Sequence, residues 1–143
     1  MKLPTVATLA LALLASCHTT RARLRTASRS DTLPFSNAVT REHLCFLAGT
    51  LGVDPATGKP PADADQEVKL MLDNFAAALA RDGLTPDDLV SVTVFCSDLT
   101  LYDNFNKVYA SAFTQGFPAR AFIGSGPLLK GCRFEIQGIA ARR

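Results

Sequence analysis

The chain has 143 residues, 48% hydrophobic and 20% charged, which suits one globular domain with a real core and excludes a disordered chain. The formal charge of +2 is unevenly placed, because five of the 15 basic residues precede Asp31, the first acidic one. Residues 31–143 therefore carry ten basic against 13 acidic side chains, a balance of −3. This mildly acidic body lacks the basic surface that nucleic-acid binding requires.

The N-terminal segment MKLPTVATLALALLASCHTT has one early lysine and an apolar run from Leu3 to Ala15. The run is shorter than the roughly 20 residues that span a bilayer and is typical of a signal peptide. Leu14-Ala15-Ser16-Cys17 resembles a bacterial lipobox, so we expect export over residues 1–17, with a lipid on Cys17 as the one membrane attachment. Residues 18–30 would then be a basic, flexible tether. Plain secretion, an organellar transit peptide and a cytoplasmic location are the alternatives, since residues 1–30 are rich in arginine, serine and threonine and contain no acid.

The first elements of the body are a hairpin and a helix. Ser36–Val39 and Leu44–Ala48 are short apolar runs joined by a charged turn, which predicts a β-hairpin. After a segment rich in proline and glycine, apolar residues recur at spacings of three and four, which predicts an amphipathic helix that Gly83 ends. The residues of this stripe are Val68, Met71, Leu72, Phe75, Ala78 and Leu79.

The second half repeats this alternation of element types. Leu89–Cys96 is dominated by β-branched residues and predicts a strand, and a second apolar stripe from Phe105 to Phe113 predicts a helix. Ala119–Ile123 and Arg133–Ala141 predict two further strands. The order β-β-α-β-α-β-β predicts an α+β sandwich with its helices on one face of the sheet.

The cysteines and histidines indicate neither a disulfide framework nor a metal centre. Beyond Cys17 there are three cysteines, Cys45, Cys96 and Cys132, and no C-x-x-C motif. An odd number cannot pair completely, and apolar strand-like surroundings favour buried free thiols. With His43 as the one histidine of the body, we predict no metal site.

Two opposite charges lie within the last two predicted strands. Alternation places Glu135 on the polar side of its strand, while Phe134 and Ile136 face the core. Arg120 follows Pro118 at a strand start, where a rigidly held guanidinium can bind a carboxylate through two parallel hydrogen bonds, as a small 2-oxo or 2-imino acid requires. The alternative is structural, an ion pair of Glu135 with Arg120 or Arg133.

The pattern Phe117-Pro118-Ala119-Arg120, followed by Phe134-Glu135-Ile136 and Ile139-Ala140, closely resembles the signature of the Rid (reactive intermediate deaminase) family, also called RidA/YjgF. LPFSNAV at residues 33–39 resembles the family's GPYSQAV. Ala48-Gly49, the DPATG loop at residues 54–58 and Val92–Phe95 also match in order, so the resemblance covers residues 31–143.

This resemblance implies a chorismate-mutase-like α+β fold that forms a homotrimer with sites in the clefts between subunits. It implies hydrolysis of 2-imino acids, such as 2-iminopropanoate and 2-iminobutanoate, to 2-oxo acids and ammonia without a metal or an organic cofactor. By the same resemblance Arg120 would bind the substrate carboxylate and Glu135 would activate the attacking water, with Asn106 close by.

Three positions depart from the family pattern and predict a more apolar substrate pocket. Phe35 replaces a tyrosine, Ala48 replaces a common serine, and Phe122 stands where some members have cysteine. One alternative function is a non-catalytic module that binds small carboxylates or protein partners and needs Arg120 but not Glu135. Another is the ribonuclease activity attached to some relatives, against which the acidic body and the export signal both argue.

Overall fold

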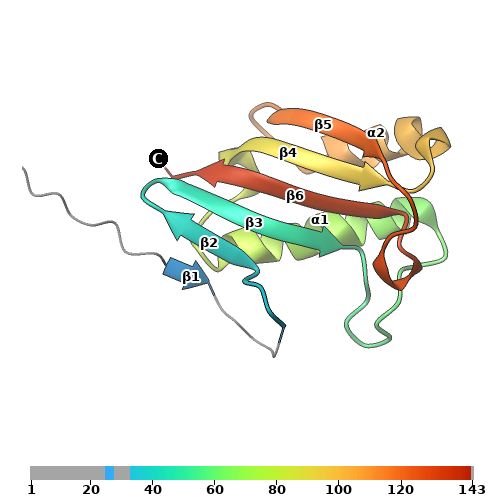
Figure 1. The fold of residues 1–143 in the computed structure, drawn as a ribbon. Helices are drawn as coiled ribbons and strands as arrows, with labels where there is room; N and C mark the ends of the chain where they lie inside the picture. The colour runs from blue at the N-terminus through green and yellow to red at the C-terminus, as the bar shows by residue number, and fades with distance from the viewer. Residues whose placement is uncertain (1–24, 28–32, 143) are drawn as a thin grey trace, which may run out of the picture.

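The computed structural model describes residues 25–27 and 33–142, and their elements form one sheet with helices on one face (Figure 1). The sheet has six strands in the order β1-β2-β3-β6-β4-β5. All neighbouring strands are antiparallel except the β4–β5 pair, which is parallel. The predicted α+β class, with both helices on the same face, is therefore confirmed.

The described elements follow the predicted order, with one strand added at the start. The strands are β1 (Arg25–Ala27), β2 (Ala38–Arg41), β3 (Leu44–Leu51), β4 (Leu89–Cys96), β5 (Ala119–Gly124) and β6 (Phe134–Ala141). The helices are α1 (Ala64–Ala80) and α2 (Tyr102–Ala110), with short 3₁₀ turns at Pro86–Asp88, Leu99–Leu101 and Leu129–Gly131. The predicted hairpin is the antiparallel β2–β3 pair.

Strand β1 lies inside residues 18–30, which we expected to be a flexible tether. It pairs antiparallel with β2, so the sheet begins before Asp31. The expected signal peptide at 1–17 and the lipidation of Cys17 lie outside the described residues. In the part of the chain that the structure describes, no helix has the length and apolar character to cross a bilayer.

Helix α1 forms as its stripe predicts. It begins after Asp63, whose carboxylate accepts a hydrogen bond from the Gln66 amide at 2.8 Å and so satisfies one unpaired donor of the first turn. After its last turn Gly83 adopts a φ of 71°, which favours glycine, and the Leu84 amide bonds back to Leu79. The buried face of the helix packs on the sheet.

Helix α2 ends at Ala110, before the end of its apolar stripe. The Ser111 hydroxyl donates to the carbonyl of Val108 at 2.7 Å, which competes with helix continuation. Just beyond, Thr114 bonds to the Asp87 carboxylate and leaves the helical path. Phe113 still packs on Tyr109, with 4.8 Å between ring centroids, so the stripe marks burial rather than helix length.

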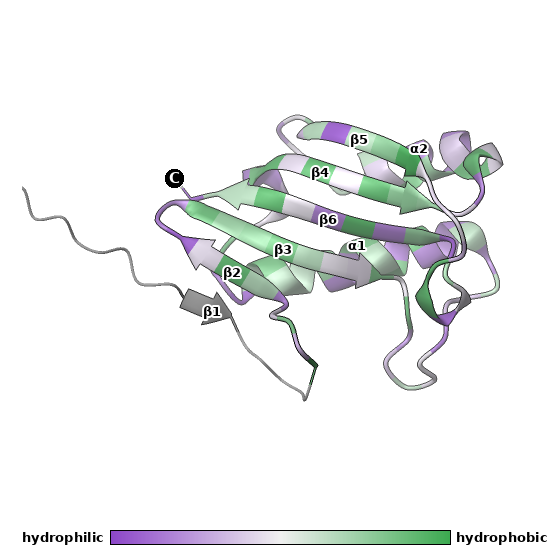
Figure 2. Ribbon diagram, in the orientation of Figure 1, coloured by the Kyte–Doolittle hydropathy of each residue, from purple (hydrophilic) through white to green (hydrophobic). Residues whose placement is uncertain are grey.

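The core lies between the helices and one face of the sheet. Alternate residues of β4 and β6, such as Val92, Val94, Phe134 and Ile136, are fully buried against the helices. The other face, which we call the open face, is covered by no helix of the described residues. It carries exposed apolar side chains, including Phe46 and Ile123 at 43% and 42% exposure, on strands that Figure 2 shows as largely apolar ribbons.

Candidate functional site

Arg120 lies on the edge strand β5 and points toward the helix layer. It pairs in register with Val92 of β4, whose side chain is buried beneath the helices, so both share that face. Its Nη2 donates to Asn106 Oδ1 of α2 at 2.7 Å. Asn106 is therefore the partner that fixes the guanidinium, rather than a solvent-exposed amide.

Aromatic rings hold Arg120 on its other sides. Its Cζ lies 4.6 Å from the Tyr109 ring centroid, and Phe105 and Phe122 follow at 5.6 and 5.7 Å. These distances are within the range of cation–π attraction. Among the described residues no carboxylate pairs with Arg120, so its positive charge is held in place without being neutralised.

A cavity of about 470 Å³ opens beside this guanidinium. Its wall includes Tyr109, whose buried hydroxyl has no hydrogen-bond partner among the described residues. Burial raises the pKa of Tyr109 to about 12, although the positive charge of Arg120 works in the opposite direction. The residues that line the cavity are Asn106, Tyr109, Ala110, Phe117, Pro118 and Arg120.

Glu135 lies on the open face, as alternation along its strand predicts. It pairs with Phe95 of β4 and Leu51 of β3, while its neighbours Phe134 and Ile136 are buried on the other face. Its carboxylate rests against Gly49, where an added methyl group would overlap Oε1. Glycine at this position therefore leaves the space that the carboxylate occupies.

Phe35 and Ala48 lie with Gly49 around a second cavity of about 440 Å³, near the end of β3 and helix α1. Phe35 is 51% exposed at its mouth. Neither side chain offers a hydrogen bond, but the cavity is also lined by Asn74, Arg81 and Lys130, so it is not the apolar pocket that the sequence predicts. Glu135 rests on Gly49 but does not itself line this cavity.

The two charged residues of the predicted site thus lie on opposite faces of the sheet. Arg120 is in register with Val92 and Glu135 with Phe95, and residues three apart on β4 face opposite sides. Asn106 and Phe122 gather with Arg120, whereas Phe35 and Ala48 line the second cavity with Gly49, the residue on which Glu135 rests. One chain alone does not bring the arginine and the glutamate together.

The alternative of an ion pair between Glu135 and Arg133 is wrong, because Arg133 pairs with Glu67 instead. Arg133 Nε lies 2.6 Å from Glu67 Oε2, and the fully buried carboxylate also accepts the amides of Arg133 and Phe134 at 2.6 and 3.2 Å. Glu135 makes no ion pair with any described residue. Glu67 was not predicted as a buried partner, although its place one turn before Met71 on the apolar stripe of α1 was a usable signal.

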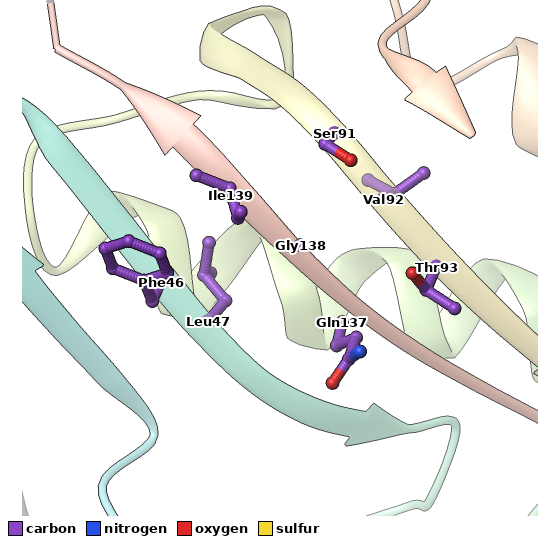
Figure 3. Close-up of a pocket in the computed structure, with 8 residues that line it drawn as sticks. All are labelled: Phe46, Leu47, Ser91, Val92, Thr93, Gln137, Gly138 and Ile139. Atoms are coloured by element: carbon purple, nitrogen blue, oxygen red, sulfur yellow. The ribbon is translucent and has the colours of Figure 1, made fainter. Parts of the chain in front are cut away.

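A third cavity, of about 280 Å³, lies on the open face across β3, β6 and β4 (Figure 3). Figure 3 shows its lining, which includes Phe46, Ser91, Thr93, Gln137 and Ile139. None of these carries a formal charge, and no predicted site residue lines the cavity. We therefore assign no chemistry to it.

The thiols are buried, as predicted: Cys45, Cys96 and Cys132 are all free and inaccessible. Burial raises the pKa of each thiol, which makes them poor nucleophiles. Within residues 33–142 no three histidine, cysteine or acidic side chains gather in a way that could hold a metal ion.

Known proteins are similar to this chain in sequence and in fold over most of their own length. The chain is 34% identical over 113 residues to a 2-iminobutanoate/2-iminopropanoate deaminase of Escherichia coli K12, which covers 77% of this chain and 88% of the relative. The crystal structure of the E. coli YjgF gene product matches with a TM-score of 0.75 and 32% identity, and that of E. coli TdcF with bound serine with 0.75 and 30%. Each of these two structural matches covers 83% of this chain and 96% of the solved chain. Since the family model described as Endoribonuclease L-PSP matches residues 26–142, the chain belongs to that family, the family of the RidA/YjgF proteins.

Proposed function

We propose that this protein is a deaminase that hydrolyses reactive 2-imino acids to 2-oxo acids and ammonia. The observation that carries the proposal is Arg120, a half-buried guanidinium fixed by Asn106 and aromatic rings beside a cavity and paired with no described carboxylate. A neutral amide orients the arginine without neutralising it. Its remaining N–H groups can therefore bind a substrate carboxylate through paired, charge-assisted hydrogen bonds.

Glu135 is the group that would activate water in this reaction. Its carboxylate accepts a proton from a water molecule as the water oxygen attacks the imine carbon, and it returns that proton to the nitrogen. The tetrahedral intermediate then passes its hydroxyl proton to the amino nitrogen, the C–N bond breaks, and ammonia leaves. The products are a 2-oxo acid and ammonia, and every atom of the imine and the water is accounted for.

We propose that the complete site forms between copies of the chain in a homotrimer. Arg120 and Glu135 lie on opposite faces of one sheet, so a second copy has to supply one of them. The open face offers an apolar contact surface for such an assembly, with Leu44, Phe46 and Ile123 each at least 40% exposed. The relatives named above as deaminases or solved with bound serine support a small amino-acid-like ligand here.

The first test follows the decay of 2-iminopropanoate and 2-iminobutanoate generated in place by an amino-acid oxidase. The protein should accelerate the decay, and Arg120→Ala and Glu135→Gln should each lower kcat/KM at least about 100-fold. Lys69→Gln, an exposed cation of α1 outside all three cavities, is the matched control. If Glu135→Gln binds 2-oxobutanoate as wild type does and wild type accelerates nothing, the chain is the non-catalytic carboxylate-binding module instead.

Mixing the two inactive variants tests the site between copies. After subunit exchange, the native Arg120 of one variant can face the native Glu135 of the other in about one quarter of the clefts of a ring with head-to-tail contacts. We expect recovery of about a quarter of wild-type activity. A mixture that stays as inactive as its components would show that no cleft combines residues of two copies.

A further inference from the structure

The cavity beside Arg120 has one charged side chain in a mostly apolar wall. In the part of the chain that the structure describes, Arg120 is the one charged residue that lines it. Ala110, Phe117 and Pro118 contribute no polar side-chain atom, and Pro118 has no backbone N–H either. The volume of about 470 Å³ lies within the roughly 300–1,000 Å³ of typical ligand pockets and exceeds what an acid of three or four carbons fills.

Neither polar side chain of this wall is placed to bind a polar substrate side chain. Asn106 Oδ1 accepts from Arg120 at 2.7 Å, which keeps the amide beside the guanidinium, where the substrate carboxylate would bind. The Tyr109 hydroxyl is buried, and its ring packs on Phe105 and Phe113 with centroid distances of 5.4 and 4.8 Å. A charged or polar substrate side chain would therefore lose water here without gaining a hydrogen-bond partner, which is unfavourable.

Phe117 is the exposed end of a row of aromatic rings. Its ring lies edge-on to Phe113 with 5.7 Å between centroids, and Phe113 packs in turn on the buried Tyr109. The residue is nevertheless 68% exposed, so most of its surface is open beside the cavity. Because the contact with Phe113 holds the ring in place before a ligand arrives, an apolar group can pack on it at a small cost in entropy.

The geometry of an imino acid directs its side chain along this wall. The imine carbon is trigonal, so the carboxylate, the nitrogen and the first side-chain carbon lie in one plane, and water attacks from above that plane. In the proposed assembly Glu135 of another copy faces the plane, while the carboxylate binds Arg120. The side chain then extends over the copy that supplies the arginine, whose free surface there is Ala110, Phe117 and Pro118.

We propose that this cavity is the side-chain pocket of the substrate, and that the preferred substrates are 2-imino acids with a bulky apolar side chain, such as 2-imino-3-phenylpropanoate and 2-imino-4-methylpentanoate. This inference rests on the proposed deaminase function. Phe117 determines the specificity, because it combines a place in the cavity wall with a large exposed apolar surface. The reaction at the imine carbon is unchanged.

The first experiment compares substrates by catalysis. An amino-acid oxidase generates 2-imino-3-phenylpropanoate from phenylalanine and 2-iminopropanoate from alanine, and kcat/KM is measured for both. Wild type should prefer the aromatic imine at least about tenfold, since burial of about two further CH₂ groups suffices for that. Phe117→Ala should reduce the preference to about threefold or less, and Phe117→Leu, which keeps an apolar wall, should retain most of it.

Leu129→Ala is the matched control for these variants. Leu129 is an apolar residue with a similar exposure of 73%, and it lines none of the three cavities. Its substitution should leave the ratio of the two kcat/KM values within about twofold of wild type. Urea unfolding checks that both Phe117 variants are folded, as the exposure of this residue leads us to expect.

The second experiment measures binding and does not depend on turnover. Calorimetry gives the Kd of three stable product analogues, namely 2-oxo-4-methylpentanoate, 2-oxobutanoate and the similarly long but charged 2-oxopentanedioate. Wild type should bind the branched apolar acid about tenfold more tightly than either of the others, and Phe117→Ala should lose that preference. The inference is overturned if wild type shows no preference for the apolar acid, or if Phe117→Ala keeps the wild-type preference.

The two experiments also separate this inference from the proposed function. If wild type prefers the apolar acid in calorimetry but accelerates neither imine, the deaminase assignment fails and the side-chain pocket stands. If wild type accelerates both imines equally and Phe117→Ala behaves as wild type, the deaminase assignment stands and the side-chain pocket is wrong.

Discussion

Replacing Glu67 with alanine should be among the most destabilising single substitutions in the molecule. The fully buried carboxylate accepts three hydrogen bonds, two of them from the backbone amides of Arg133 and Phe134 at the start of β6. Glu67→Ala leaves those amides without an acceptor, at about 1–3 kcal/mol each, and removes the partner of Arg133. Because the Arg133 side chain is 28% exposed and keeps its bonds to the carbonyls of Pro61 and Ala62, it regains some hydration. We expect a total loss of about 3–4 kcal/mol.

Urea unfolding followed by circular dichroism, at one fixed protein concentration, measures this loss. Glu67→Gln keeps an acceptor for the backbone amides and should cost only about 1–2 kcal/mol. Asp73→Ala, an exposed acid of the same helix, is the control and should stay within about 0.5 kcal/mol. If Glu67→Ala costs no more than the control, the hydrogen bonds to Glu67 do not stabilise the fold, and the reasoning is refuted.

Three further predictions follow from single contacts. Gly49→Ala should displace the Glu135 carboxylate and lower kcat at least about tenfold, with little change in stability. Gly126→Ala is the control, because open space surrounds that residue, and it should leave activity intact. Equal effects of the two substitutions would contradict the role of Gly49. Burial raises the pKa of Tyr109 to about 12 in the folded protein, so the unfolded chain loses this proton first and the free energy of unfolding should fall as pH rises from 10 to 12, by about 1 kcal/mol at pH 11. Tyr109→Phe should abolish this part of the loss in urea titrations at pH 9 and 11. In a Cys17→Ser background, the three buried thiols, whose pKa values burial raises, should react with an aromatic disulfide reagent at pH 8 far more slowly than in urea; rapid native labelling would argue against their burial.

Local sequence patterns predicted most of the fold, because the buried side chains recur with the regular spacing of a helix or a strand. The apolar stripe of α1 and the alternation of β4 and β6 report which side chains face the core, and the structure places them there. The sequence placed the end of α2 less well. Phe113 belongs to the core by its contact with Tyr109, but Ser111 and Asp87 end the helix before it through side-chain hydrogen bonds that periodicity does not detect.

Long-range partners were the part that the sequence could not supply. Only the family resemblance placed Asn106 near the site, because its bond to Arg120 depends on how α2 packs beside β5. Glu67 lies 66 residues from Arg133 along the chain, and only the packing of α1 against β6 makes them neighbours. Strand β1 was missed for a related reason, since three residues of an arginine-rich segment carry no alternation long enough to predict pairing.

The separation of Arg120 and Glu135 follows from the registers of β5 and β6 with β4. Both strands pair with β4, and their contacts at Val92 and Phe95 differ by an odd number of residues, so the two charges face opposite sides of the sheet. Arg120 is on the edge strand, where its cavity can open toward a neighbouring molecule, while Glu135 lies on a central strand whose open side has no helix. A site that needs both groups therefore depends on the contact between copies as much as on the fold of each. A one-residue insertion in β5 before Arg120 would turn the guanidinium to the open face, and the hydrogen bond to Asn106 would be lost with it.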